Sequence, residues 1–369
     1  MITALTNYTF FNGQDEIKGK AILIEGEKIM AIVDVNEIPS DTKIVDCNGF
    51  YLSPGLVDLQ IYGAGGYLFS NNPSAEALHA IADAIVNTGT TGFLLTLATN
   101  SMKIFRQAIE VVKNNPHPAL LGLHLEGPYI NPIKKGAHLE QYIKIPVVKE
   151  VKALLDEAEG VIKMMTLAPE VCDDEVIGLL LKNNVIVSAG HSNATYAEAK
   201  RGFDLGVQTT THLFNAMSPF HHRETGLPGA TFLSNASASI IADGIHVDYE
   251  TISISKKILG QRLFLITDAV EENLEGAYVH MASEDRFTLP DGTLSGSRLT
   301  LLQAVKNCVQ HAGIDLPEAL QMATLYPHRL LGHTTSGILE PGCPANVILF
   351  DSDLNIRKSY LNGKETSQT

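Results

Sequence analysis

The feature that most constrains the fold is an alternation of short apolar runs with helical segments through the middle of the chain. Short apolar runs bounded by turn residues are typical of buried strands, and apolar residues spaced three and four apart predict amphipathic helices. The expected strands are Leu56–Ile61, Gly92–Leu97, Leu120–Leu125, Ile162–Leu167, Val185–Ala189, Val207–Thr211, Ala238–Ala242 and Leu263–Ile266. The expected helices are Ala75–Asn87, Met102–Asn114, Val148–Glu159, Asp174–Asn183, Tyr196–Leu205, Leu299–Ala312 and Leu316–Leu325. Eight strands alternating with helices predict a (β/α)₈ TIM barrel.

An open, doubly wound sheet is the rival interpretation, but the chain lacks the GxGxxG turn of its nucleotide-binding versions. Both ends of the chain have β patterns, such as Ala21–Ile24 and Asn346–Phe350, and neither end can bury a core alone. We therefore predict that residues 1–52 and 335–369 pair into a small β-sandwich domain. Residues 53–334 would then form the barrel.

Polar residues stand at the ends of six expected strands, where barrel active sites lie. They are Gln60, Glu126, His191, His212, His246 and Asp268, and each follows an apolar run. Glu126 also directly precedes Gly127-Pro128, which ends its strand. A carboxylate buried there needs a metal, a cation or a hydrogen-bond donor as its partner.

One carboxylate and two imidazoles, from Glu126, His191 and His212, match the ligand set of catalytic zinc sites. A hydrogen-bond network at the barrel mouth is the alternative for this trio, since no HExxH signature is present. Asp268 would be the general base, or else a structural cap for the next segment. His138, in the loop after the third strand, could help to stabilise an oxyanion.

The segment from Asn215 to Arg223 holds the densest cluster of donors in an otherwise acidic chain. Arg223 with His222 could bind a phosphate group, with help from Asn215 and nearby backbone N–H groups. A solvated basic patch is the plain alternative. Gln60 stands where two-metal barrels of this kind carry His-x-His, which favours one metal rather than two.

The overall charge bears on possible partners. The formal net charge is −14, which argues against nucleic acid or an anionic membrane as a general partner. The N-terminus shows no signal-peptide pattern, and no apolar run is long enough to span a bilayer. The four cysteines form no CxxC pair, so we expect reduced thiols in a cytoplasmic protein.

Several segments together resemble a known family. LHLEGPYINPIKKGAH, AGHSNATY, THLFNAM, ADGIHVD, LITDA and MATLYPHRLLG resemble the N-acetylglucosamine-6-phosphate deacetylases of the amidohydrolase superfamily, and the match covers almost the whole chain. The resemblance implies a homodimeric, metal-dependent barrel that removes the acetyl group from N-acetylglucosamine 6-phosphate in amino-sugar catabolism. It leaves open the 4-epimer, N-acetylgalactosamine 6-phosphate, and the metal, with zinc favoured over iron, cobalt or manganese.

The resemblance also implies roles for single residues. Glu126, His191 and His212 fall on the metal ligands and Asp268 on the catalytic acid/base, while His138 falls on the residue that orients the acetyl carbonyl. The implied substrate-binding residues are Asn215, Ala216, His246 and Arg223, of which Arg223 reaches the site of the partner subunit. Gln60 matches the single-metal branch of the family.

Two other functions are compatible with a barrel of this kind, and the sequence disfavours both. A cyclic-amide hydrolase such as a dihydroorotase is disfavoured because the first strand has no HxH and no metal-bridging Lys is apparent. A non-catalytic sugar-phosphate binding protein is disfavoured because Glu126, His191, His212 and Asp268 are all present.

Overall fold

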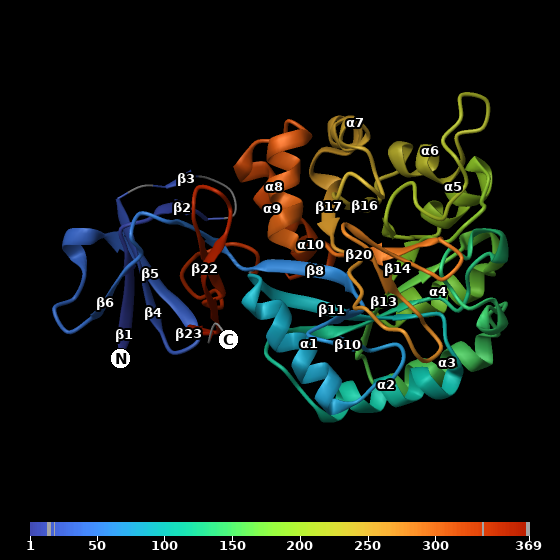
Figure 1. The fold of residues 1–369 in the computed structure, drawn as a ribbon, viewed down its shortest axis with the longest axis horizontal. Coiled ribbons are helices and arrows are strands. Elements are labelled where there is room, and N and C mark those ends of the chain that lie inside the picture. Colours follow the sequence, from blue (N-terminus) through green and yellow to red (C-terminus); the bar gives the residue numbers. More distant parts are fainter. Residues whose placement is uncertain (13–15, 18, 334–335, 367–369) are drawn as a thin grey trace.

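The computed structural model describes residues 1–12, 16–17, 19–333 and 336–366 (Figure 1). The middle of the chain forms the predicted barrel, and the two ends of the chain form small β sheets beside it. In Figure 1 these sheets stand to the left, where blue N-terminal strands and red C-terminal strands lie together. The (β/α)₈ fold with a small β portion built from both termini is therefore confirmed.

The barrel is an eight-stranded sheet whose strands follow chain order. All its strand pairs are parallel. Its strands are β8 (Leu56–Ile61), β11 (Thr90–Ala98), β12 (Leu120–Glu126), β13 (Ile162–Leu167), β14 (Ile186–Ala189), β15 (Thr209–Thr210), β16 (Ser237–Ile241) and β17 (Leu263–Ile266). At the carboxyl ends of β8 and β17, the Asp268 N–H donates to the Gln60 carbonyl at 3.0 Å and the Tyr62 N–H donates to the Ala269 carbonyl at 2.9 Å. These bonds join the first strand to the last.

Helices surround the sheet and bury one apolar face each against it. They are α1 (Ala75–Asn87), α2 (Met102–Asn114), α3 (Val148–Ala158), α4 (Asp174–Lys182), α5 (Tyr196–Asp204), α6 (Gly226–Leu233), α7 (Tyr249–Leu259), α8 (Leu301–His311), α9 (Leu316–Ala323) and α10 (Leu325–Leu330). In α2, Phe105 and Ile109 are buried on one face, and the Ser101 hydroxyl accepts the Ile104 N–H at the start of the helix. An amphipathic helix is expected to have buried residues three or four positions apart and a side-chain cap at its start, and α2 has both.

Two sheets from the chain ends pack around a second core. One sheet contains β5 (Lys28–Asp34), β4 (Lys20–Glu25), β1 (Ile2–Thr6) and β6 (Lys43–Asp46). The other contains β23 (Lys364–Glu365), β22 (Ile356–Leu361), β21 (Val347–Phe350), β7 (Tyr51–Pro54), β2 (Thr9–Phe11) and β3 (Glu16–Ile17). Leu5, Ile22, Leu52 and Val347 belong to one buried cluster, so each end of the chain supplies the apolar surface that the other lacks.

The boundaries expected between the two parts stay predictions. The one after residue 52 falls inside β7, whose last residue is Pro54. The one between residues 334 and 335 lies outside the described residues. Among the described residues, no helix is both long enough and apolar enough to cross a membrane. Cys47, Cys172, Cys308 and Cys343 are buried free thiols.

Several features differ from the sequence-based expectation. The last expected helix ends at Leu325, where the structure begins a further helix, α10. The sixth barrel strand, β15, has only two residues. Helices α6 and α7 occupy segments where no helix was expected, and both lack a clear helical signal because α6 contains Gly226, Pro228 and Gly229 and α7 is rich in β-branched residues. After β17 the chain also forms a small antiparallel sheet of β18 (Met281–Ala282), β19 (Arg286–Thr288) and β20 (Leu294–Ser297).

Candidate metal centre and substrate pocket

The carboxyl ends of the barrel strands bring five of the sequence-predicted site residues to one mouth of the barrel. Glu126 is the last residue of β12, and Gln60 is the residue before the last in β8. His191, His212 and Asp268 each follow the end of their strand, β14, β15 and β17, by two residues. Because parallel strands of a barrel end at the same mouth, side chains far apart in the sequence converge there.

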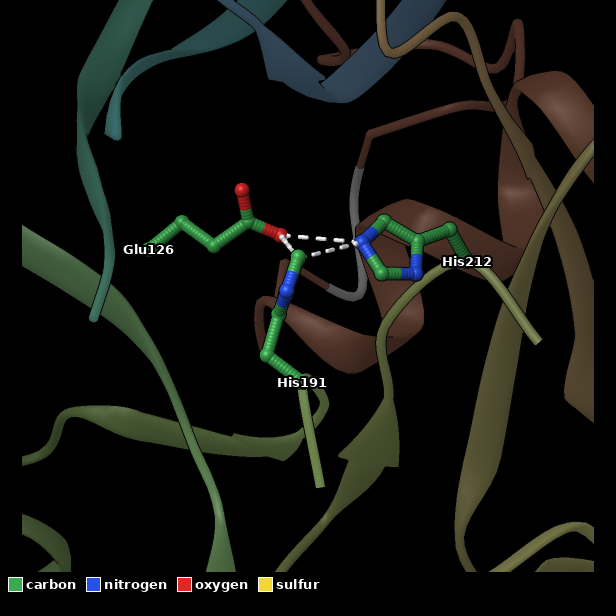
Figure 2. Close-up of side chains that lie close together, drawn as sticks. All are labelled: Glu126, His191 and His212. Atoms are coloured by element: carbon green, nitrogen blue, oxygen red, sulfur yellow. Dashed lines mark hydrogen bonds and ion pairs between the residues drawn. The ribbon is translucent and has the colours of Figure 1, made fainter. Parts of the chain in front are cut away.

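Glu126, His191 and His212 point toward one another in the centre of this mouth (Figure 2). The His191 Nε2 atom lies 3.3 Å from Glu126 Oε1 and 3.1 Å from His212 Nε2. The His212 Nε2 atom lies 3.1 Å from Glu126 Oε1. All three side chains are buried, and among the described residues they form a group that could hold a metal ion.

The chemistry of these atoms fits a cation. The Nδ1 atom of His191 lies 2.9 Å from the Lys134 carbonyl oxygen. Since a carbonyl only accepts, Nδ1 carries the proton and Nε2 carries a lone pair. That lone pair faces Glu126 Oε1, which is also an acceptor, so the two atoms repel unless a cation lies between them. One carboxylate and two imidazoles would leave a coordination position for water or substrate.

The carboxylate of Glu126 is held from several sides. The Tyr62 hydroxyl donates to Oε2, and Gln60 Nε2 donates to Oε1 at 3.1 Å. Burial alone would raise the pKa of Glu126, but the neighbouring His191 and His138 hold it well below its usual value. Glu126 is therefore ionised at neutral pH, as a metal ligand must be.

Asp268 lies beside Glu126 and shares a donor with it. Gln60 Nε2 lies 2.7 Å from Asp268 Oδ1. Burial first, and then the negative charge of Glu126, raise the pKa of Asp268 well above its usual value. A cation bound by the trio would oppose this effect, because its charge favours the ionised form. Environment thus pushes the two carboxyl groups toward opposite protonation states, as in acid/base pairs of enzymes.

His138 reaches the same centre from the loop after β12. Its Nε2 lies 3.0 Å from Glu126 Oε2. Its Nδ1 accepts the Thr99 backbone N–H at 3.1 Å, so Nε2 carries the proton and can donate. Burial first, and then the neighbouring His191, lower the pKa of His138 to about 4. The ring is therefore a neutral donor at physiological pH.

Three of these residues have a left-handed backbone. The φ angles are +46° at His191, +32° at His212 and +53° at Asp268. Non-glycine residues rarely adopt this region, and each such residue costs on the order of 1 kcal/mol or more. Such strain persists where surrounding contacts fix the backbone, and it clusters at functional sites.

A pocket of about 350 Å³ opens above the trio. Asn215, Ala216 and His246, which were expected to bind substrate, all line it, as does Lys134. His246 Nδ1 lies 2.6 Å from Asp243 Oδ2, which fixes the ring and leaves Nε2 for a ligand. The structure thus gathers these residues with the trio around one cavity.

Arg223 and His222 are the exceptions. Both are exposed, and neither lines the pocket of its own chain. The Arg223 backbone N–H bonds to His221 Nδ1 at 3.3 Å. A role of Arg223 at this site within one chain is therefore not supported by its position.

The sequence pattern missed several lining residues. Tyr62 follows the first barrel strand and lines the pocket. Thr99 follows the second strand and does not line the pocket, but it holds His138. Neither residue type signals a site by itself. Tyr278, His280 and Ser295 line the pocket from the segment around β18–β20. To predict them, one would have to expect an extra β hairpin segment after β17. The stretch from residue 271 to 297 is rich in Gly and polar residues and has no clear strand pattern that would indicate one.

Comparisons with known proteins agree with this geometry. The model of the amidohydrolase family matches residues 51–366. N-acetylglucosamine-6-phosphate deacetylase of Haemophilus influenzae is 35% identical over 98% of both chains. N-acetylgalactosamine-6-phosphate deacetylase of Escherichia coli O157:H7 is 30% identical over 89% of this chain and 91% of its own.

A solved structure extends the similarity to the whole fold. The crystal structure of N-acetylglucosamine-6-phosphate deacetylase from Pasteurella multocida superposes with a TM-score of 0.96 at 34% identity, covering 100% of each chain. The family match, the relatives and this structure together cover almost the whole chain, so the similarity is not limited to one domain. The chain therefore belongs to the amidohydrolase family and, within it, to the group of the N-acetylglucosamine-6-phosphate deacetylases.

Proposed function

We propose that the protein hydrolyses the acetamide of N-acetylglucosamine 6-phosphate to glucosamine 6-phosphate and acetate, in amino-sugar catabolism. The observation that carries the proposal is the buried Glu126, His191 and His212 trio beside Asp268 at the floor of a sugar-sized pocket. The similar relatives that bear this activity in their names support it.

One divalent metal per chain, with Zn²⁺ favoured over Fe²⁺, Co²⁺ or Mn²⁺, would be held by Glu126, His191 and His212. When bound, such an ion lowers the pKa of water to about 7 and polarises a carbonyl group. Gln60 supports a single ion, because its amide donates to both Glu126 and Asp268 where two-metal sites place ligands.

Asp268 and His138 would handle the protons. Asp268 takes a proton from the attacking water, whose oxygen bonds to the acetamide carbon, and returns it to the nitrogen as the C–N bond breaks. His138 keeps its Nε2 proton and donates a hydrogen bond from it to the carbonyl oxygen as negative charge builds there. The return of the proton matters because an amide nitrogen leaves poorly unless it is protonated.

The sugar phosphate would be bound by Asn215, Ala216 and His246. We further propose that the chain acts as a cytoplasmic homodimer in which Arg223 of one subunit reaches the phosphate in the other. The exposed position of Arg223, outside the pocket of its own chain, supports an action between subunits.

Acetate release tests the proposal. N-acetylglucosamine 6-phosphate should be hydrolysed far faster than N-acetylglucosamine, because the phosphate contributes charge-assisted hydrogen bonds. Equal rates on both sugars would contradict a phosphate-binding site, and no release from either would refute the deacetylase assignment.

The relative from E. coli O157:H7 makes N-acetylgalactosamine 6-phosphate a second candidate substrate. The two sugars differ only in the orientation of one hydroxyl group. Comparing kcat/KM on the two 6-phosphates decides between them, and the larger value identifies the substrate.

A further inference from the structure

We propose that Leu68, Ala98 and Val270, with Tyr62 and Tyr278, form an acyl subsite that receives the acetyl methyl group and sets the length of acyl chain the enzyme removes. The inference rests on the proposed function and names the part of the substrate that these residues recognise. It starts from an apolar cluster that is separate from both main cores.

The cluster lines the same pocket as the trio. Leu68 lies in β10 (Tyr67–Leu68), Ala98 ends β11, and Val270 follows β17. The five residues are 3–8% exposed, and Phe287 of β19 belongs to the same cluster. Because these five side chains are almost fully buried and form one cluster with Phe287, the shape of this part of the pocket is fixed before a substrate enters.

Contacts with the catalytic groups locate this wall beside the reacting atoms. The Tyr62 hydroxyl bonds to Glu126. Ala98 precedes Thr99, whose N–H holds His138, and the Tyr278 hydroxyl donates to the Thr99 carbonyl at 2.5 Å. Val270 stands two residues after Asp268. The cluster thus borders the groups that would act on the carbonyl carbon.

The groups expected to hold the sugar come from strands that lie across the barrel from β11, which carries Ala98. Asn215 and Ala216 follow β15, and His246 follows β16. In the ring of eight strands, β15 lies four places from β11, which carries Ala98.

The shape of the amide decides which group faces the cluster. A secondary amide is planar and trans, so its two carbon substituents project to opposite sides of the C–N bond. With the sugar carbon directed toward β15 and β16, the methyl group is directed toward the side of the mouth where β11 carries Ala98. A methyl group there meets the apolar surface of the cluster, and transfer from water to such a surface is favourable.

Such a wall discriminates by size. One methylene more or less in an apolar pocket changes kcat/KM by about 10- to 200-fold. The subsite would therefore favour acetyl over formyl, because the methyl group contacts its apolar side chains. It would exclude propionyl, because the additional methylene group does not fit.

The test compares N-formyl-, N-acetyl- and N-propionylglucosamine 6-phosphate, each measured as carboxylate release. Leu68→Ala enlarges the subsite and should raise the propionyl-to-acetyl ratio of kcat/KM about tenfold. Ala98→Val fills it and should lower the acetyl-to-formyl ratio by about the same factor. A ratio of kcat/KM between two substrates of the same enzyme sample does not depend on the fraction of enzyme that is folded. Dividing the ratio of the variant by that of the wild type cancels the intrinsic reactivity of each amide.

Ile133→Ala is the matched control, because Ile133 lines the same pocket but is 75% exposed and lies outside the cluster. It should leave both ratios at their wild-type values. Val270→Ala replaces Leu68→Ala if the latter does not fold. An active enzyme whose ratios stay unchanged in the enlarging or the filling variant would overturn the subsite alone. A wild type that releases no carboxylate would overturn the proposed function, and the subsite with it.

Discussion

At the scale of the residue, the account depends on two carboxyl groups that share the amide of Gln60. Glu126 is surrounded by donors and imidazoles that keep it ionised. Asp268 is pushed toward the protonated form by burial and by the charge of Glu126. Glu126 is thereby suited to bind a cation. The charge of a bound cation would in turn favour the ionised form of Asp268, which can then accept a proton and return it.

Asp268→Asn should therefore keep the metal but lose most turnover. The amide is close in size to the carboxyl and leaves the trio intact, yet it cannot accept the proton of the attacking water. General acid/base groups contribute about 10²- to 10⁴-fold, and kcat should fall by that order. Metal analysis of the same sample checks that the ligands still bind. Full activity in a metal-loaded variant would contradict the role of Asp268.

At the scale of the element, the sequence predicted what depends on local pattern. Strand β8 and helices α1 and α2 have the predicted bounds, because their apolar residues repeat with the right period. Glu126 and His138 were found because each stands in a recognisable segment after an apolar strand.

Contacts between distant segments could not be predicted in the same way. Tyr62 binds Glu126 across 64 positions of sequence, and Thr99 holds His138 across 39. Neither partner has a local signal, since a tyrosine or threonine after a strand is common. The segment around β18–β20 also closes over the pocket through tertiary packing rather than through periodicity.

Helix α10 provides a stability test that is separate from the metal centre. His328 is buried there, and its Nδ1 has no hydrogen-bond partner among the described residues. Burial, and then the charge of His333, lower the pKa of His328 to about 3. As pH falls below about 6.5, the unfolded chain gains a proton that the folded chain does not, so stability is lost.

Between pH 7 and pH 5, this one group should lower the free energy of unfolding by on the order of 2 kcal/mol. His328→Leu, which cannot take up a proton, should lose correspondingly less over the same interval. Denaturant unfolding of both proteins at the two pH values measures the difference. Equal losses would show that His328 is not held neutral in the folded protein.

At the scale of the whole molecule, the charge distribution explains how an acidic chain could bind a phosphorylated sugar. With a net charge of −14, the chain as a whole repels anions, so binding requires local donors. Asn215, His246 and Lys134 line the pocket, whereas Arg223 is exposed outside it. We propose that a second copy of the chain brings its Arg223 to the phosphate.

Mixing two inactive variants tests this arrangement. Arg223→Ala lacks the cation that a subunit offers to its partner, and Asp268→Asn lacks the base of its own site. A heterodimer of the two would contain one site with an intact Asp268 and with Arg223 of the partner. Activity should therefore return to about half of the wild-type value per dimer. No recovery in verified heterodimers would show that Arg223 acts within its own chain.

The central claim, a deacetylase that depends on one metal held by Glu126, His191 and His212, is tested most directly by reconstitution. Protein freed of metal by a chelator is titrated with Zn²⁺, and acetate release from N-acetylglucosamine 6-phosphate is followed. We expect no activity without metal, a linear rise with added ion and a plateau at one ion per chain, with no recovery in His191→Asn. Full activity in the metal-free protein, or a plateau only at two ions per chain, would contradict the account.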